Sequence, residues 1–112
     1  MTFSELQKEI DEWAQQFITP YWKPHEMIAR LAEETGELAR EINHRYGPKK
    51  KKPSEETKEI GEEICDIFMN LICLANSQSI NLDQHWKNLM DKLYKRDSKR
   101  FERKDGGMQN GL

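Results

Sequence analysis

Apolar residues recur at spacings of three and four along most of the chain, which is the spacing of one face of an α-helix. The pattern predicts helices over about 3–19, 24–45, 54–76 and 82–101, and no stretch alternates convincingly like a β-strand. The first, second and fourth of these helices carry one apolar stripe each. The stripes consist of Phe3, Leu6, Ile10, Trp13 and Phe17, then Met27, Leu31, Leu38 and Ile42, and finally Leu82, Trp86, Leu89, Leu93 and Phe101.

Residues that favour helix ends flank these segments. Those at the starts are Thr2 with Glu5 as a capping box, Pro24 in a first turn, and Ser54 and Asn81 as N-caps. Those at the ends are Thr19–Pro20 and Gly47–Pro48. The sequence therefore predicts an all-α fold, a four-helix bundle in a single domain over residues 1–104, with a flexible tail at 105–112.

The third predicted helix is apolar nearly all round. Between Ile64 and Ala75 only Asp66 and Asn70 are polar, and such a helix is normally buried on most sides. A chain of 112 residues that is 36% hydrophobic builds one small core at most. We therefore expect oligomerisation to complete the bundle, as a homodimer or a dimer of dimers.

Several classes of protein are excluded by the composition. No apolar run approaches the roughly 18 residues of a membrane span, and the N-terminus lacks the pattern of a secretion signal. Cys65 and Cys73 would lie about 12 Å apart along one helix, too far for a disulfide, so we expect reduced thiols and a cytoplasmic protein. A general nucleic-acid-binding protein would be distinctly basic, so the net charge of −2 argues against that class.

The net charge conceals a segregation of charge along the chain. Residues 53–83 carry seven acids and one base, for a net of −6, whereas residues 84–104 carry eight bases and three acids, for a net of +5. Opposite charge in neighbouring segments suggests separate binding roles. One function compatible with this pattern is a non-catalytic helical interaction module, whose basic C-terminal helix would bind an acidic partner or nucleic acid.

Two pairs of acidic residues recur at the spacing i, i+3. Glu34 and Glu37 share one face of the second predicted helix, and Glu63 and Asp66 share one face of the third. Helices joined by a short loop pack antiparallel by preference. The two pairs would then bring four carboxylates into one small volume. Other acids, such as Glu62, are expected to lie on solvent-exposed faces of their helices.

Asp66 lies in the most apolar part of the chain and has no lysine or arginine within one turn of its own helix. A buried carboxylate is costly unless it is paired or binds a metal, so a cation is expected. An all-oxygen ligand set suits Mg²⁺ first and Mn²⁺ second. Zinc would require histidine or cysteine ligands at short spacing. A di-iron bundle would require a Glu-x-x-His pair on each of two helices, and only Glu41 with His44 has that spacing, so a di-iron site is excluded.

The two acidic segments together resemble a known family. Leu-Ala-Glu-Glu-Thr-Gly-Glu-Leu-Ala at 31–39, followed by Glu-Glu-Ile-Cys-Asp-Ile at 62–67, resembles the E-E-x-x-E and E-x-x-D motifs of MazG-like proteins. The resemblance covers about residues 20–104. It implies an all-α nucleoside triphosphate pyrophosphohydrolase that cleaves between the α- and β-phosphates to give a monophosphate and pyrophosphate. It also implies that Mg²⁺ is bound by Glu34, Glu37, Glu63 and Asp66.

Further roles follow from this resemblance. Lys92 and Arg96 are similar to the K-x-x-x-R phosphate contacts of the family, and would hold the leaving pyrophosphate through charge-assisted hydrogen bonds. Glu33 is the candidate for orienting or deprotonating the attacking water. The resemblance is also compatible with a role in removing unwanted nucleotides from the pool, and a phosphoribosyl-ATP pyrophosphohydrolase is a narrower alternative within the same family.

Contacts to the sugar and the base are harder to read. Asn70 would contact the sugar or a metal-bound water, or else make a hydrogen bond in helix packing. Trp22 is the candidate for stacking on the base, and Lys23 for reaching a phosphate. We expect Trp13 and Phe17 to pack in the core instead.

Overall fold

The computed structural model describes residues 1–48 and 59–106, whose regular secondary structure is entirely helical, with no strand. Their elements are α1 (Phe3–Ala14), α2 (Pro24–Tyr46), α3 (Ile60–Ser77), α4 (Leu82–Lys92) and one π-helical turn, η1 (Leu93–Asp97). The predicted all-α fold is confirmed. The predicted N-cap Ser54 and most of the predicted tail lie outside the described residues, and α3 begins later than expected, at Ile60.

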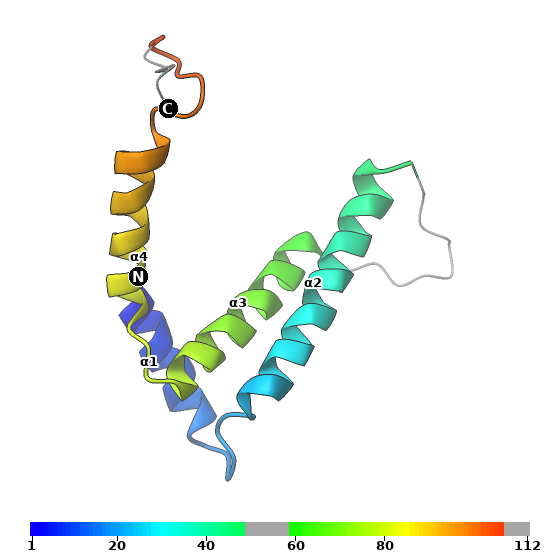
Figure 1. Cartoon of the computed structure of the whole chain (residues 1–112). Helices are drawn as coiled ribbons and strands as arrows, with labels where there is room; N and C mark the ends of the chain where they lie inside the picture. The colour runs from blue at the N-terminus through cyan, green and yellow to red at the C-terminus, as the bar shows by residue number, and fades with distance from the viewer. Residues whose placement is uncertain (49–58, 107–112) are drawn as a thin grey trace.

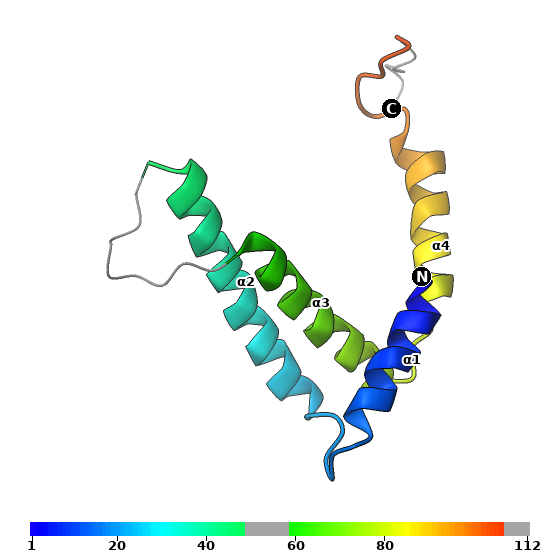
Figure 2. The same cartoon turned by 180° about the vertical axis from the view of Figure 1, so that it is seen from behind.

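The centre of the molecule is a pair of long helices, α2 and α3, which lie side by side and run antiparallel as predicted (Figures 1 and 2). Pro24 occupies the first turn of α2, where its missing N–H costs nothing. The Glu26 carboxylate accepts a hydrogen bond of 3.1 Å from the backbone N–H of Lys23 and so closes the start of the helix. This pair carries both predicted acidic motifs.

Helix α1 packs across the C-terminal half of α3. The fully buried apolar side chains lie where α1, α2 and α3 meet, and they are Ala14, Met27, Ile72 and Ala75. The Thr2–Glu5 capping box is present at the start of α1. The predicted end at Thr19–Pro20 is wrong, because α1 ends at Ala14 and the chain continues in turns, with the N–H of Phe17 bonded to the carbonyl of Ala14 at 3.1 Å.

Helix α4 is joined to the start of α1. The carboxylate of Asp83 accepts hydrogen bonds from the backbone N–H groups of Phe3 at 2.9 Å and Ser4 at 3.1 Å, and also from the Ser4 hydroxyl. The rings of Phe3 and Trp86 pack with centroids 5.5 Å apart. From this joint α4 extends away from α2 and α3 (Figure 1).

The start of the fourth helix agrees with the prediction, whereas its end does not. Asn81 is its N-cap as expected, accepting a hydrogen bond of 3.3 Å from the N–H of Gln84. The α-helix does not reach Phe101, however, since it changes to a π-helical turn at Leu93 and then to turns, and the Phe101 side chain is exposed.

One copy of the chain does not close into a bundle. Its radius of gyration is 18.7 Å, compared with about 13 Å for a compact domain of this length. The expectation that α3 is buried on most sides is wrong for a single copy, because Ile64, Phe68 and Leu71 are all exposed. Trp86 and Leu89 on α4 are exposed as well. Exposed apolar side chains on two helices are typical of a chain that packs against another protein surface.

Two further predictions from the sequence concern the cysteines and membrane-spanning helices. Cys65 and Cys73 are both free thiols, as expected. Within residues 1–48 and 59–106, no helix combines the length and the hydropathy needed to cross a bilayer.

Candidate active site

Three carboxylates meet between α2 and α3. Glu34 and Glu37 from α2 and Glu63 from α3 each place one oxygen within 4.8 Å of the others. Glu34 is 2% exposed and Glu63 is fully buried. We call these three residues the carboxylate cluster. They belong to the four metal ligands predicted from the sequence.

The electrostatics of the carboxylate cluster favour an added positive charge. Burial raises the pKa of Glu34, and the nearby charges of Glu37, Asp66 and Glu63 raise it further, against the opposing effect of Arg30. Arg30 Nη2 lies 2.8 Å from Glu34 Oε1. The other oxygen, Oε2, is buried with no hydrogen-bond partner in the described part of the chain. A buried carboxylate oxygen of this kind is suited to a hard cation, so the residues present fit Mg²⁺ or Mn²⁺.

Asp66 does not have the surroundings predicted for it. It was expected to be the buried acid of α3, but it is exposed, and the buried acid of that helix is Glu63. Residues three apart on a helix are offset by about 60° around its axis, and this offset takes Asp66 from the covered face of α3, where Glu63 lies, to its open edge. Asp66 lies at the open edge of the carboxylate cluster, near enough for its charge to act on Glu34.

Glu41 is a buried acid to which the sequence analysis gave no role in the site. It is 5% exposed and lies one turn beyond Glu37 on α2. Met27, Glu34 and Glu41 are the buried residues of α2 and are spaced seven apart. A spacing of seven keeps residues close to one line of a helix. This spacing is the signal in the sequence that identifies Glu41 as buried, because Glu34 and Glu41 continue the buried line that starts at Met27.

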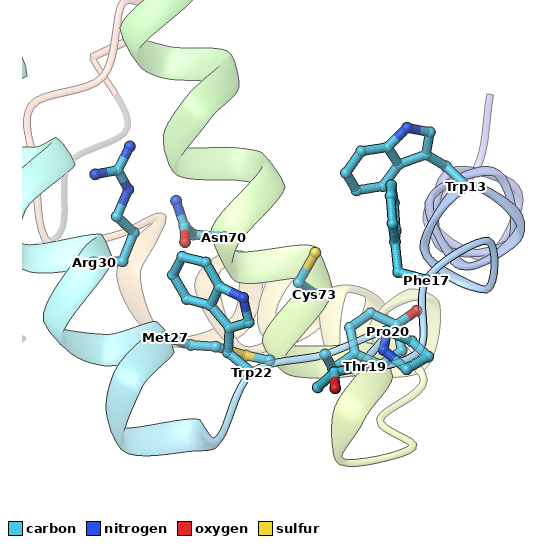
Figure 3. A pocket seen from close by; sticks show the side chains of 10 residues that line it. Trp13, Phe17, Thr19, Pro20, Trp22, Met27, Arg30, Asn70 and Cys73 are labelled. Atoms are coloured by element: carbon cyan, nitrogen blue, oxygen red, sulfur yellow. The ribbon is translucent and has the colours of Figure 1, made fainter.

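A cavity of about 410 Å³, whose lining residues are drawn in Figure 3, reaches the carboxylate cluster at Arg30, the partner of Glu34. Its size is in the range of small-molecule pockets. Its lining is largely aromatic and apolar, and consists of Trp13, Phe17, Thr19, Pro20, Tyr21, Trp22, Met27, Arg30, Asn70 and Cys73. Arg30 therefore belongs both to the cavity and to the surroundings of Glu34.

Two aromatic residues serve the cavity instead of the core. The Trp13 and Phe17 rings pack edge to face with centroids 5.1 Å apart, and each side chain is about half exposed. The expectation that they pack in the core is therefore wrong, because Trp13 lies at the end of α1 on a wall of the cavity and the turn after Ala14 brings Phe17 against it (Figure 3). Trp22 lines the same cavity, as predicted for a base-stacking residue.

Asn70 presents a hydrogen-bond acceptor to this cavity. Its Nδ2 donates to the carbonyl of Asp66 at 2.9 Å. Because that carbonyl can only accept, the amide orientation is fixed and Oδ1 points toward the cavity (Figure 3). Of the alternatives left open for Asn70, the structure contains the hydrogen bond within the helix and also leaves an oxygen for a ligand.

The remaining predicted site residues are spread more widely. Glu33 is exposed beside the carboxylate cluster and lies 3.4 Å from Arg30. Lys23 is the exposed N-cap of α2 and is absent from the cavity lining. Lys92 and Arg96 lie on α4 and η1, away from the cluster, and the guanidinium of Arg96 is paired with Asp97 at 2.8 and 2.9 Å.

Comparison with known proteins gives a consistent result. Residues 22–101 match the model of the MazG nucleotide pyrophosphohydrolase domain. The chain is 47% identical to the protein YpjD of Bacillus subtilis (strain 168) over 106 residues, which cover 95% of this chain and 96% of that protein.

Solved structures share the fold. The crystal structure of YPJD from Bacillus subtilis superposes with a TM-score of 0.73 at 48% identity, covering 82% of this chain and 94% of that one. The Bacillus-conserved MazG protein, a nucleotide pyrophosphohydrolase, superposes with a TM-score of 0.72 at 42% identity, covering 88% and 95%. These matches favour the enzyme over the non-catalytic module. With its acidic motifs on α2 and α3 and its full-length likeness to these proteins, the chain belongs to the MazG family of nucleotide pyrophosphohydrolases.

Proposed function

We propose that the protein is a Mg²⁺-dependent nucleoside triphosphate pyrophosphohydrolase, which converts a (deoxy)nucleoside triphosphate and water into the monophosphate and pyrophosphate. The observation that carries the proposal is the carboxylate cluster beside an aromatic cavity. A triphosphate placed across the two would have its base among aromatic rings and its phosphates near the acids. Mn²⁺ is expected to substitute for Mg²⁺.

Glu34, Glu37 and Glu63 would hold the metal, with Asp66 at the open edge of the cluster. Bound there, Mg²⁺ would neutralise phosphate charge that the carboxylates otherwise repel and would stabilise the charge that develops on the leaving group. Glu33 is proposed to accept the proton of the attacking water. The water oxygen then forms the new bond to phosphorus as the α–β bridging bond breaks.

The cavity would bind the nucleoside. Trp22 offers a face for the base, and Asn70 Oδ1 accepts a hydrogen bond from a sugar hydroxyl or a base N–H. Lys23 is proposed to reach a phosphate from the start of α2. We further propose that the enzyme acts in the cytoplasm to remove unwanted nucleotides, in line with its two free thiols.

We propose that the active form is a homodimer or a dimer of dimers. The support is the exposed apolar surface of α3 and α4, which includes Phe68, Trp86 and Leu89. Because α4 extends away from its own carboxylate cluster, Lys92 and Arg96 would contact phosphates at the site of a neighbouring copy. In that case Arg96 exchanges Asp97 for phosphate.

The test is the release of pyrophosphate, as opposed to orthophosphate, from a panel of ordinary and modified triphosphates with Mg²⁺, Mn²⁺ or EDTA. Glu37→Gln should abolish the release, while Glu62→Gln, an exposed acid outside the carboxylate cluster, should leave it unchanged. Equal activity in EDTA and in Mg²⁺, or full activity of Glu37→Gln, would contradict the proposed metal site.

A further inference from the structure

The cavity has two walls of different construction. Met27, Arg30, Asn70 and Cys73 come from the long helices α2 and α3. The opposite wall comes from the end of α1 and from residues 15–23, which form turns without a regular helix or strand (Figure 3). A wall made of turns has few backbone hydrogen bonds of its own, so its position depends on how it is attached to its neighbours.

The hydroxyl group of Tyr21 makes that attachment. It donates to Asp11 Oδ1 on α1 at 2.5 Å and accepts from Asn76 Nδ2 on α3 at 3.1 Å. Among the described residues, the second of these is the hydrogen bond that joins segment 15–23 to α3. Tyr21 also lines the cavity. One hydroxyl group therefore connects the irregular wall to both helices behind it.

The groups that bind this hydroxyl are themselves fixed. Asn76 Nδ2 also donates to the carbonyl of Gln7 at 3.0 Å, and Gln7 Nε2 donates back to Asn76 Oδ1 at 2.9 Å. The same Gln7 amide bonds to the carbonyl of Ile80 at 2.8 Å and to the N–H of Leu82 at 3.2 Å. The network thus includes α1, α3 and the connection to α4, and it holds the two partners of Tyr21 at a set separation.

The hydrogen bond to Asp11 is charge-assisted, which makes it stronger and more directional than a neutral one. It holds the pKa of Asp11 below its usual range. Burial, together with this hydrogen bond, raises the pKa of Tyr21 to about 12. The tyrosine therefore stays protonated, and continues to donate, at any pH used for assay.

We propose that Tyr21 is a positioning residue that sets the gap between the two walls of the nucleoside cavity. It acts through Trp22 and the neighbouring rings, not through the phosphates. The inference rests on the proposed function of the cavity. It predicts that loss of the hydroxyl weakens binding of the nucleoside part of a substrate and leaves phosphate and metal binding intact.

The decisive variants are Tyr21→Phe and two substitutions of its acceptor. Tyr21→Phe should raise KM for the triphosphate about 3- to 10-fold with kcat within twofold, and should weaken binding of a nucleoside monophosphate by the same factor. Inhibition by inorganic pyrophosphate with Mg²⁺ should not change. Asp11→Asn keeps an acceptor oxygen and should behave like the wild type, whereas Asp11→Leu should behave like Tyr21→Phe. Tyr46→Phe, at an exposed tyrosine at the end of α2, is the matched control.

A readout without any ligand separates this inference from the proposed function. In a Trp86→Phe background, the emission of Trp13 and Trp22 should be quenched more strongly by acrylamide after Tyr21→Phe than after Tyr46→Phe. Unchanged quenching with unchanged KM would overturn the role of Tyr21. An equal loss of pyrophosphate binding would also overturn it, since that indicates general disruption of the fold. Absence of pyrophosphate release from the wild type, with the quenching difference present, would overturn the proposed function alone.

Discussion

The helix pairs α2–α3 and α1–α4 depart from ordinary packing in opposite ways. Between α2 and α3, Glu34, Glu41 and Glu63 are buried in places where apolar side chains would normally lie. On α4, Trp86 and Leu89 are exposed in places where charged side chains would normally lie. The first pair buries charge that a cation would compensate, and the second exposes apolar surface that another protein surface would cover.

This difference separates two sources of stability. The carboxylate cluster costs folding free energy in the absence of metal, because the buried Glu34 Oε2 is moved away from water and has no hydrogen-bond partner among the described residues. The α1–α4 pair costs little and gains only part of the burial available to it, because Trp86 contacts Phe3 but stays half exposed and Leu89 is 42% exposed. Binding of metal should therefore stabilise the first pair, and association of copies should stabilise the second.

The largest expected effect comes from removing charge inside the carboxylate cluster. Glu63→Gln should lower pyrophosphate release by about 100-fold or more, since even groups that only support metal ligands are worth 10- to 100-fold. Steady-state assays of pyrophosphate release measure this loss, with Glu62→Gln, an exposed acid outside the carboxylate cluster, as the control. Activity of Glu63→Gln within tenfold of the wild type would contradict its place in the metal site.

The next effect is stabilisation by the metal itself. At a free Mg²⁺ concentration 100 times Kd, the free energy of unfolding should rise by about 2.7 kcal/mol. Thermal or urea unfolding in MgCl₂ and in EDTA measures this difference. The gain should vanish in Glu63→Gln and persist in Glu62→Gln. An equal gain in both variants would indicate that Mg²⁺ acts elsewhere.

Breaking the apolar stripe of α4 tests the second pair. Leu89→Glu should weaken association of copies by at least tenfold, or about 1.4 kcal/mol, because a charge replaces an apolar side chain in the proposed contact. Light scattering over a range of concentrations follows the dissociation. Lys87→Glu, an exposed change in the same helix, is the control. A wild type that is monomeric at all concentrations would rule out the proposed oligomer.

The joint between α1 and α4 should depend on pH. Hydrogen bonds, chiefly from the Ser4 hydroxyl, hold the pKa of Asp83 below its usual 3.8. A lowered pKa in the folded state means that the stabilisation is present above pH 3.8 and is lost as the pH falls through the lowered value. Trp86 emission should therefore change on acidification in the wild type and much less in Asp83→Asn. As a control, the Trp86 emission of Asp91→Asn should change with pH as it does in the wild type.

The smallest effect is expected at the connection between the two pairs. Ser79 has a φ of 55°, in the region that favours glycine, and it follows α3 in a Schellman arrangement with Ile80 N–H bonded to the carbonyl of Ala75 at 2.9 Å. Ser79→Gly should stabilise the fold by about 0.5–1 kcal/mol by relieving strain against a cost in unfolded-state entropy. Urea unfolding measures the change. Destabilisation would mean that the serine side chain contributes more than its backbone strain costs.

The features that depend on local spacing were predictable from the sequence. The i, i+3 acids, the Thr2–Glu5 capping box and the Asn81 cap need only the geometry of one helix. The exposure of Asp66 and the cavity position of Trp13 were not predictable. The first depends on which face of α3 is covered by other helices. The second depends on the end of α1 at Ala14, because the local sequence around that residue contains no glycine or proline that would predict a helix end.

The spacing of seven residues along α2 has a consequence for how this chain can vary in length. Met27 lines the cavity and Glu34 belongs to the carboxylate cluster, about 10 Å apart on one continuous helix. An insertion or deletion of one residue between them would rotate every later acid by about 100° about the helix axis. We therefore expect related sequences to keep the length of residues 28–33 constant, while changes in length gather in the turns of residues 15–20.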